Sequence, residues 1–124
     1  MSFEGEALLR RYFEVLDGGG IDALWGLVSD DCRDHNPMRG QLPGKGGVIM
    51  KVILFRREHP DARVVVESIE PVPGGARATW TTTAVGLNGS KGKATWRFSA
   101  VFEIGEKLRS SQVTSTELVR EEYE

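Results

Sequence analysis

The sequence is short of the residues on which several functions depend. Of its 124 residues, one is cysteine and two are histidine. A single cysteine, Cys32, excludes an intrachain disulfide and a cysteine-built metal site, and favours a reducing cytoplasm. The net charge of −2 gives no basic excess, so we expect no nucleic-acid partner. The longest apolar run, Val52 to Phe55, is far too short to cross a bilayer, and Met1 to Glu4 do not resemble a signal peptide. No membrane partner is therefore expected, and the predicted location is cytoplasmic.

What the sequence does contain is typical of a folded protein. Hydrophobic residues make up 40 % and charged residues 27 %, which excludes a disordered chain. The length predicts a single domain over residues 1–124.

The first half of the chain shows helical periodicity in three places. Residues 5–17 carry apolar side chains on one face, and residues 44–59 carry them around most of the circumference, which predicts burial on more than one side. The second helix, about 21–29, is shorter and turns three residues inward: Leu24, Trp25 and Val28. Residues 30–40 are expected to form a loop and a short strand.

The second half alternates between apolar and polar positions and is rich in β-branched residues. This pattern predicts four strands, at about 64–69, 76–86, 93–104 and 108–119, joined by short turns into an antiparallel meander. Helices followed by strands indicate the α+β class. We expect three N-terminal helices packed on a curved antiparallel sheet, together forming a cone.

The two faces of this sheet differ in chemistry. One face is aromatic, with Trp80, Trp96, Phe98 and Phe102. The other face carries polar residues with little charge: Thr79, Thr81, Thr83, Thr95, Arg97 and Ser99. We hypothesise that this polar face pairs with a second copy of the chain, which would make the protein a homodimer.

The segment Arg33-Asp34-His35-Asn36-Pro37 carries the strongest chemical signal. Imidazole exchanges protons near neutral pH, so His35 is the first candidate for acid or base catalysis, with Asp34 able to bias its charge. Neighbours in an extended segment point to opposite sides, however. The alternative is a histidine bonded to the loop backbone. Asn36 is either a ligand-orienting amide or part of an Asx-turn before Pro37.

Several stretches of the chain resemble the nuclear transport factor 2-like superfamily, and within it the SnoaL-like polyketide cyclases. The segments that carry the resemblance are Arg11 to Asp17, Gly20 to Leu24, Ser29 to Asp31, Asp34 to Pro37, Gly44 to Pro60 and Val101 to Leu108. The resemblance covers nearly the whole chain and implies a cystatin-like cone around a hydrophobic pocket. It does not imply one activity, because the superfamily includes isomerases, cyclases, hydrolases and non-catalytic binders.

The related ketosteroid isomerases suggest roles for some positions. Tyr12 matches their oxyanion-binding tyrosine, whereas Asn36 stands at the position of their general base and Ala100 at that of their second, protonated donor. The acid that polyketide cyclases carry on the last strand has no counterpart in residues 110–114. The resemblance therefore implies the fold more strongly than either known mechanism.

We predict a cavity that binds a small, mostly apolar carbonyl compound and needs no cofactor. If the protein is an enzyme, it would catalyse isomerisation, cyclisation or dehydration, with His35, Asp34 and Tyr12 as catalytic residues. The substrate-binding candidates are Asn36, Trp80, Thr82, Trp96, Phe98 and Ser111, although the tryptophans could equally be core residues. The other function left open is a non-catalytic binding or dimerisation module. A metal site from Asp34, His35 and His59 would need a chance meeting of distant segments, so no metal is expected.

Overall fold

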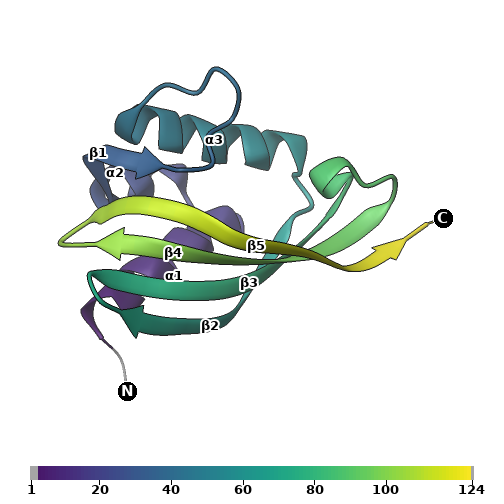
Figure 1. The fold of residues 1–124 in the computed structure, drawn as a ribbon. Coiled ribbons are helices and arrows are strands. Elements are labelled where there is room, and N and C mark those ends of the chain that lie inside the picture. Colours follow the sequence, from purple (N-terminus) through teal and green to yellow (C-terminus); the bar gives the residue numbers. More distant parts are fainter. Residues whose placement is uncertain (1–2, 124) are drawn as a thin grey trace.

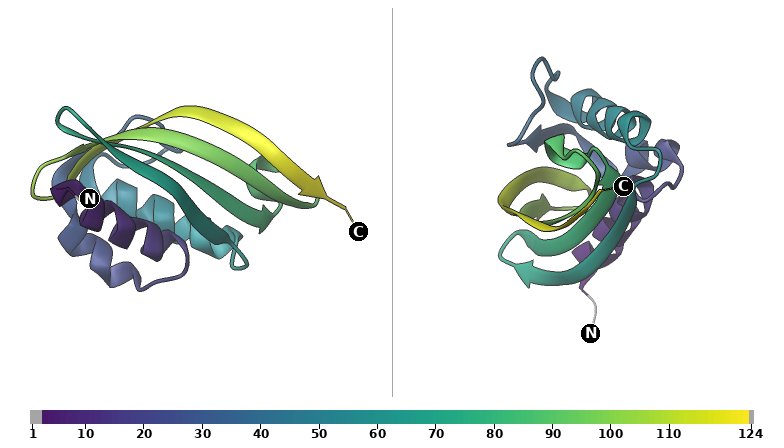
Figure 2. Two further views of the ribbon diagram at one scale, coloured as in Figure 1. Left: turned by 90° about the horizontal axis from the view of Figure 1, so that it is seen from below. Right: turned by 90° about the vertical axis from the view of Figure 1, so that its right-hand side faces the viewer.

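The computed structural model describes residues 3–123 as one curved sheet with helices packed on its concave side (Figures 1 and 2). In chain order the elements are α1 (Glu4–Leu16), a 3₁₀ turn η1 (Ile21–Ala23), α2 (Leu24–Leu27), β1 (Val28–Asp34), α3 (Gly44–Glu58), β2 (Arg63–Val72), β3 (Gly75–Val85), a turn η2 (Leu87–Gly89), β4 (Lys93–Ile104) and β5 (Leu108–Glu122). The predicted α+β class and the three helical regions are confirmed.

The sheet has the strand order β1-β5-β4-β3-β2. Strands β2 to β5 form the predicted antiparallel meander, and β1 adds a fifth strand that runs parallel to β5. The sheet is therefore mixed rather than wholly antiparallel. This addition matters for function because it brings the end of β1 beside β5, with Asp34 opposite Ser111.

The inner face of the sheet is set by the register between β3 and β4. Trp80 lies opposite Phe98, and Ala78 lies opposite Ala100. Large and small side chains thus alternate along the concave face, and both alanines are fully buried. The core fills one part of the cone, where Phe13 contacts Trp80 and Phe102 with ring centroids 4.9 and 6.0 Å apart.

Helix α3 reaches its place because its first turn packs very closely on the preceding backbone. A Cβ atom at Gly47 would lie 1.7 Å from the carbonyl oxygen of Leu42, and one at Gly44 would lie 2.8 Å from that of Asp30. Only glycine permits these approaches, which explains the glycine-rich start of the helix in structural terms. The close contact holds α3 against β1, and so brings Lys51 of α3 near the end of that strand.

Part of the sequence prediction for the second helix is wrong. The helical region ends at Leu27, and Val28 begins β1. Trp25, which was expected to face inward, is 55 % exposed. The other two residues predicted to face inward, Leu24 and Val28, are buried, and Leu27 is buried with them. The error at Trp25 arises because the segment is too short for helical spacing to define a full amphipathic face.

The outer face of the sheet carries the predicted threonine-rich surface. Thr79 is hydrogen-bonded to Ser99, and Thr83 to Thr95. Arg97 forms ion pairs with Glu67 and Glu117. Pairing of this face with a second copy of the chain stays a prediction that a solution mass would test.

No helix within residues 3–123 is long and apolar enough to span a membrane.

Candidate active site

A cavity of about 230 Å³ lies inside the cone, between helices α1 and α3 and the inner face of the sheet. Most of its surface is apolar, as is usual for sites that bind small organic molecules. The residues that line it are Tyr12, Leu16, Asp34, Val48, Lys51, Val52, Phe55, Val64, Trp80, Thr82, Phe98, Ala100, Phe102, Ser111 and Val113. Five polar residues stand in its wall: Tyr12, Asp34, Lys51, Thr82 and Ser111.

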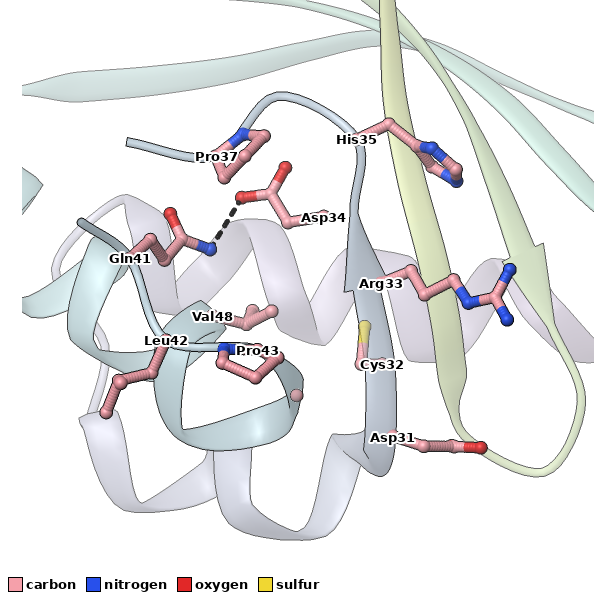
Figure 3. Close-up of a pocket in the computed structure, with 11 residues that line it drawn as sticks. Asp31, Cys32, Arg33, Asp34, His35, Pro37, Gln41, Leu42, Pro43 and Val48 are labelled. Carbon is pink, nitrogen blue, oxygen red and sulfur yellow. Dashed lines mark hydrogen bonds between the residues drawn. The ribbon is translucent and has the colours of Figure 1, made fainter. Parts of the chain in front are cut away.

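Asp34 is the carboxylate of this cavity, and the local structure holds it firmly. Its Oδ1 accepts a hydrogen bond from the backbone N–H of Asn36 at 2.9 Å. Its Oδ2 accepts one from Lys51 Nζ at 2.9 Å and one from Gln41 Nε2 at 3.1 Å. Figure 3 shows the Gln41 amide directed at this carboxylate. The Asp34 side chain is only 7 % exposed, and both of its oxygens accept hydrogen bonds from protein donors.

The electrostatics follow from these contacts. Burial alone would raise the pKa of Asp34, but the hydrogen bonds from Lys51, Asn36 and Gln41 outweigh it and hold this pKa below its ordinary value of 3.8. Burial, the charge of Asp34 and the neighbouring Cys32 raise the pKa of Tyr12. The cavity therefore contains an ionised carboxylate and a neutral phenol at neutral pH.

Tyr12 belongs to the apolar face of α1, and its ring packs against Phe13 and Phe102 with centroids 5.6 and 6.2 Å apart. Its hydroxyl makes no hydrogen bond to any other residue among those described. The side chain keeps some accessible surface, and it lines the cavity. A phenol in this position is able to donate a hydrogen bond to a ligand.

Four of the six predicted substrate-binding residues line the cavity: Trp80, Thr82, Phe98 and Ser111. Trp80 and Phe98 stack with centroids 5.7 Å apart and form an aromatic wall. Trp96 does not line the cavity. Its indole N–H donates to Ser90 Oγ at 3.2 Å, farther along the same face of the sheet.

Asn36 also lies outside the cavity lining. Its side-chain oxygen accepts a hydrogen bond from the N–H of Val113 at 2.7 Å, and its backbone oxygen accepts one from Lys51 at 2.7 Å. The residue therefore ties the end of β1 to β5 and helps to position Lys51. The turn in this segment is made by the carboxylate of Asp34, not by the amide of Asn36.

His35 does not line the cone cavity. It is exposed, and Figure 3 shows its ring on the opposite side of β1 from Asp34, together with Arg33. Arg33 and His35 border a second, more open hollow of about 650 Å³ between β1 and residues 37–44. The alternation of side chains along a strand separates the two neighbours, so the cavity receives the carboxylate and not the imidazole. A catalytic role for His35 stays a prediction without support from this position.

Lys51 is the functional candidate that sequence analysis missed. It lines the cavity, and its ammonium pairs with Asp34 across 17 residues of sequence. The sequence feature that could have identified Lys51 is that it is the only charged residue between Val48 and Phe55. A charge inside an apolar helix face usually has a partner, but the sequence alone does not say which.

The described residues contain no group of three or more histidine, cysteine, aspartate or glutamate side chains placed to hold a metal ion. Cys32 is buried in β1, and burial, with the charges of Asp34 and Asp31, raises the pKa of its thiol to about 11. The residue is thus a poor nucleophile at neutral pH.

Solved structures share this fold at low sequence identity. A proposed polyketide cyclase from Bacillus cereus superposes with a TM-score of 0.72 at 18 % identity, covering 86 % of this chain and 70 % of the other. IdmH, a proposed polyketide cyclase from Streptomyces antibioticus, gives 0.74 at 12 % identity and covers 92 % of each chain. A cystatin-fold protein of uncharacterised function from Novosphingobium aromaticivorans gives 0.70 at 15 % identity, covering 92 % of this chain and all of the other.

None of the curated proteins matches the chain. The family model of the SnoaL-like domain, in contrast, matches residues 9–109, which include most of α1, all of α3 and strands β1 to β4. Only the first two residues of β5 fall within the match, so Ser111 and Val113 of the cavity lie just beyond it. This agrees with the resemblance seen in the sequence and with the cone observed in the structure. The chain belongs to the SnoaL-like domain family.

Proposed function

We propose that the cone cavity binds a small, mostly apolar carbonyl compound and promotes its cofactor-free isomerisation, cyclisation or dehydration. The observation that carries this proposal is the hydroxyl of Tyr12, which bonds to no other described residue and lies in the wall of an apolar cavity that also contains Asp34. The proposed polyketide cyclases among the structural neighbours support the same class of chemistry.

The proposed mechanism uses groups that line the cavity. Because its pKa is raised, the Tyr12 phenol stays protonated and donates a hydrogen bond to the carbonyl oxygen of the ligand. Negative charge develops on that oxygen when the neighbouring carbon loses a proton, so the hydrogen bond is strongest in the transition state. Among the described residues, Asp34 is the only carboxylate in the lining and would receive the proton.

Deuterium exchange tests this chemistry without knowledge of the natural substrate. The probe is 2-tetralone, a bicyclic ketone with acidic α-protons, incubated with the protein in D₂O and followed by NMR. We expect exchange at the α-carbon above the buffer rate, and a loss of about 100-fold or more of that excess in Tyr12→Phe and Asp34→Asn. Exchange at the buffer rate with bound probe would contradict the catalytic part of the proposal.

His35→Ala is the matched control, since it removes an ionisable side chain from the same strand on the side away from the cavity. The cavity mechanism predicts that this variant exchanges protons at the wild-type rate. Inactivity of His35→Ala with an unchanged melting temperature would instead support the role that the sequence predicted for the imidazole.

A second candidate function, non-catalytic ligand binding, is favoured by the surroundings of Asp34. Three protein donors occupy its oxygens and lower its pKa, which makes it a weak base. For this function, the same experiment would give saturable binding of 2-tetralone by calorimetry and no exchange above the buffer rate.

A further inference from the structure

The polar groups of the cone cavity that remain available to a ligand have one property in common: each of them can donate a hydrogen bond. Both oxygens of Asp34 already accept bonds from Lys51, Gln41 and the backbone of Asn36. No other carboxylate lines the cavity, and the remaining polar groups are the ammonium of Lys51 and three hydroxyls that bond to no other described residue, on Tyr12, Thr82 and Ser111.

Lys51 has capacity left for a ligand. An ammonium carries three N–H donors, and two of them are used, by Asp34 Oδ2 at 2.9 Å and by the backbone oxygen of Asn36 at 2.7 Å. The side chain is 34 % exposed and borders both the cavity and the outer surface of α3. Its remaining donor is therefore accessible at the rim of the cavity.

Two of the hydroxyls lie near the same carboxylate as Lys51. Ser111 is opposite Asp34 in the pairing of β1 with β5. Tyr12 is close enough for its ionisation to respond to the charge of Asp34. The donors of Lys51, Tyr12 and Ser111 thus gather around one end of a cavity whose other walls are aromatic and aliphatic.

We infer that the ligand of this cavity is an amphipathic organic anion, a carboxylate or a stable enolate on an apolar body, whose charged oxygen binds Lys51. A neutral ligand could give the third N–H of Lys51 only an uncharged acceptor, whereas an anion gains a charge-assisted hydrogen bond in a partly dehydrated site. This inference rests on the proposed function, because it assigns a charge to the ligand of the same cavity.

The test compares two probes of the same shape by titration calorimetry: 2-naphthoate, which is an anion, and 2-naphthamide, which is neutral. Wild-type protein is expected to bind the anion about tenfold more tightly than the amide. Lys51→Met should abolish this preference. Asp34→Asn should increase it, since the ammonium remains while the competing negative charge is removed.

The two substitutions are expected to change the preference for the anion in opposite directions, so a folding defect in one variant does not decide the test. If Lys51→Met does not fold, Asp34→Asn still contradicts the inference when its affinity for 2-naphthoate fails to rise. Equal affinity of the wild type for both probes would overturn the anionic ligand and leave the proposed cavity function standing. Failure of 2-naphthoate, 2-naphthamide and 2-tetralone to bind would overturn both.

Discussion

The two faces of the sheet use the same kinds of hydroxyl side chain in different ways. On the outer face they bond to one another, with Thr79 Oγ1 at 2.9 Å from Ser99 Oγ and Thr83 Oγ1 at 2.8 Å from Thr95 Oγ1. On the inner face, Thr82 lines the cavity and has no such partner among the described residues. Paired hydroxyls stabilise the sheet, while unpaired ones beside a cavity remain available to a ligand.

The two faces differ in how their hydroxyl side chains are packed, not in the kinds of residue that carry them. Ser29 Oγ is the only fully buried side-chain polar atom in residues 3–123 that lacks a hydrogen bond. Tyr12 and Ser111 keep accessible surface on the cavity, whereas Thr82 lines the cavity but is itself buried. A filled core would have left them as buried, unsatisfied groups, which folded proteins avoid.

The largest effect on the free energy of unfolding is expected where the inner face of the sheet is packed into the core. Phe102 is 2 % exposed and contacts Tyr12, Phe13 and Trp80. Phe102→Ala should lower the free energy of unfolding by about 3–5 kcal/mol, measured by urea denaturation. Ser99→Ala on the outer face, which removes one surface hydroxyl, should cost about 1 kcal/mol or less. A similar cost for both substitutions would mean that the inner face is not the core.

A smaller effect is expected at the end of β1. Asp34→Asn weakens three hydrogen bonds to a buried carboxylate and should cost about 1–3 kcal/mol at pH 7. Because the folded pKa of Asp34 lies below 3.8, the carboxylate stabilises the fold above the unfolded pKa of about 3.9, and this contribution is lost as the pH falls through the folded value.

The difference in unfolding free energy between wild type and Asp34→Asn should therefore be constant from pH 7 to about 5 and shrink below about 4. Urea titrations across this range measure it. Asp31→Asn is the control, since that carboxylate is exposed and makes no hydrogen bond to another described residue. A pH-independent difference for Asp34→Asn would show that its carboxylate is not held by charge-stabilising bonds.

The smallest effect compares neighbours on β3 that face opposite sides. Thr83→Val removes a hydrogen bond to Thr95 and should cost about 0.5–1 kcal/mol. Thr82→Val removes a hydroxyl that bonds to no other described residue, from a side chain that is 3 % exposed, and should leave stability unchanged or raise it by up to about 1 kcal/mol. Melting curves of the two variants test the comparison. If Thr82→Val is the more destabilising, the inner hydroxyl has a structural partner after all.

The faces of the sheet could be predicted from sequence because alternation fixes them. In residues 93–104, Phe98, Ala100 and Phe102 fall on one side, and they do line the cavity. Alternation also separates Asp34 from His35, but it does not say which of the two faces inward. That choice depends on the parallel pairing of β1 with β5, a contact between segments about 80 residues apart that no local pattern encodes.

Lys51 escaped prediction for a related reason. The helix that carries it is apolar around most of its circumference, so periodicity could not show which side faces the cavity. Its direction is set by the close packing of Gly44 and Gly47 on the preceding backbone. The position of the ammonium is thus a consequence of tertiary contact, as is its pairing with Asp34.

The most direct test of the central claim, an open cavity whose inner hydroxyls await a ligand, is a crystal structure of the protein with 2-tetralone. We predict density for the ketone between Trp80 and Phe98 on one side and α3 on the other, with its carbonyl oxygen about 3 Å from the Tyr12 hydroxyl. A cavity closed by these same side chains, or a ketone bound only outside the cone, would contradict the account.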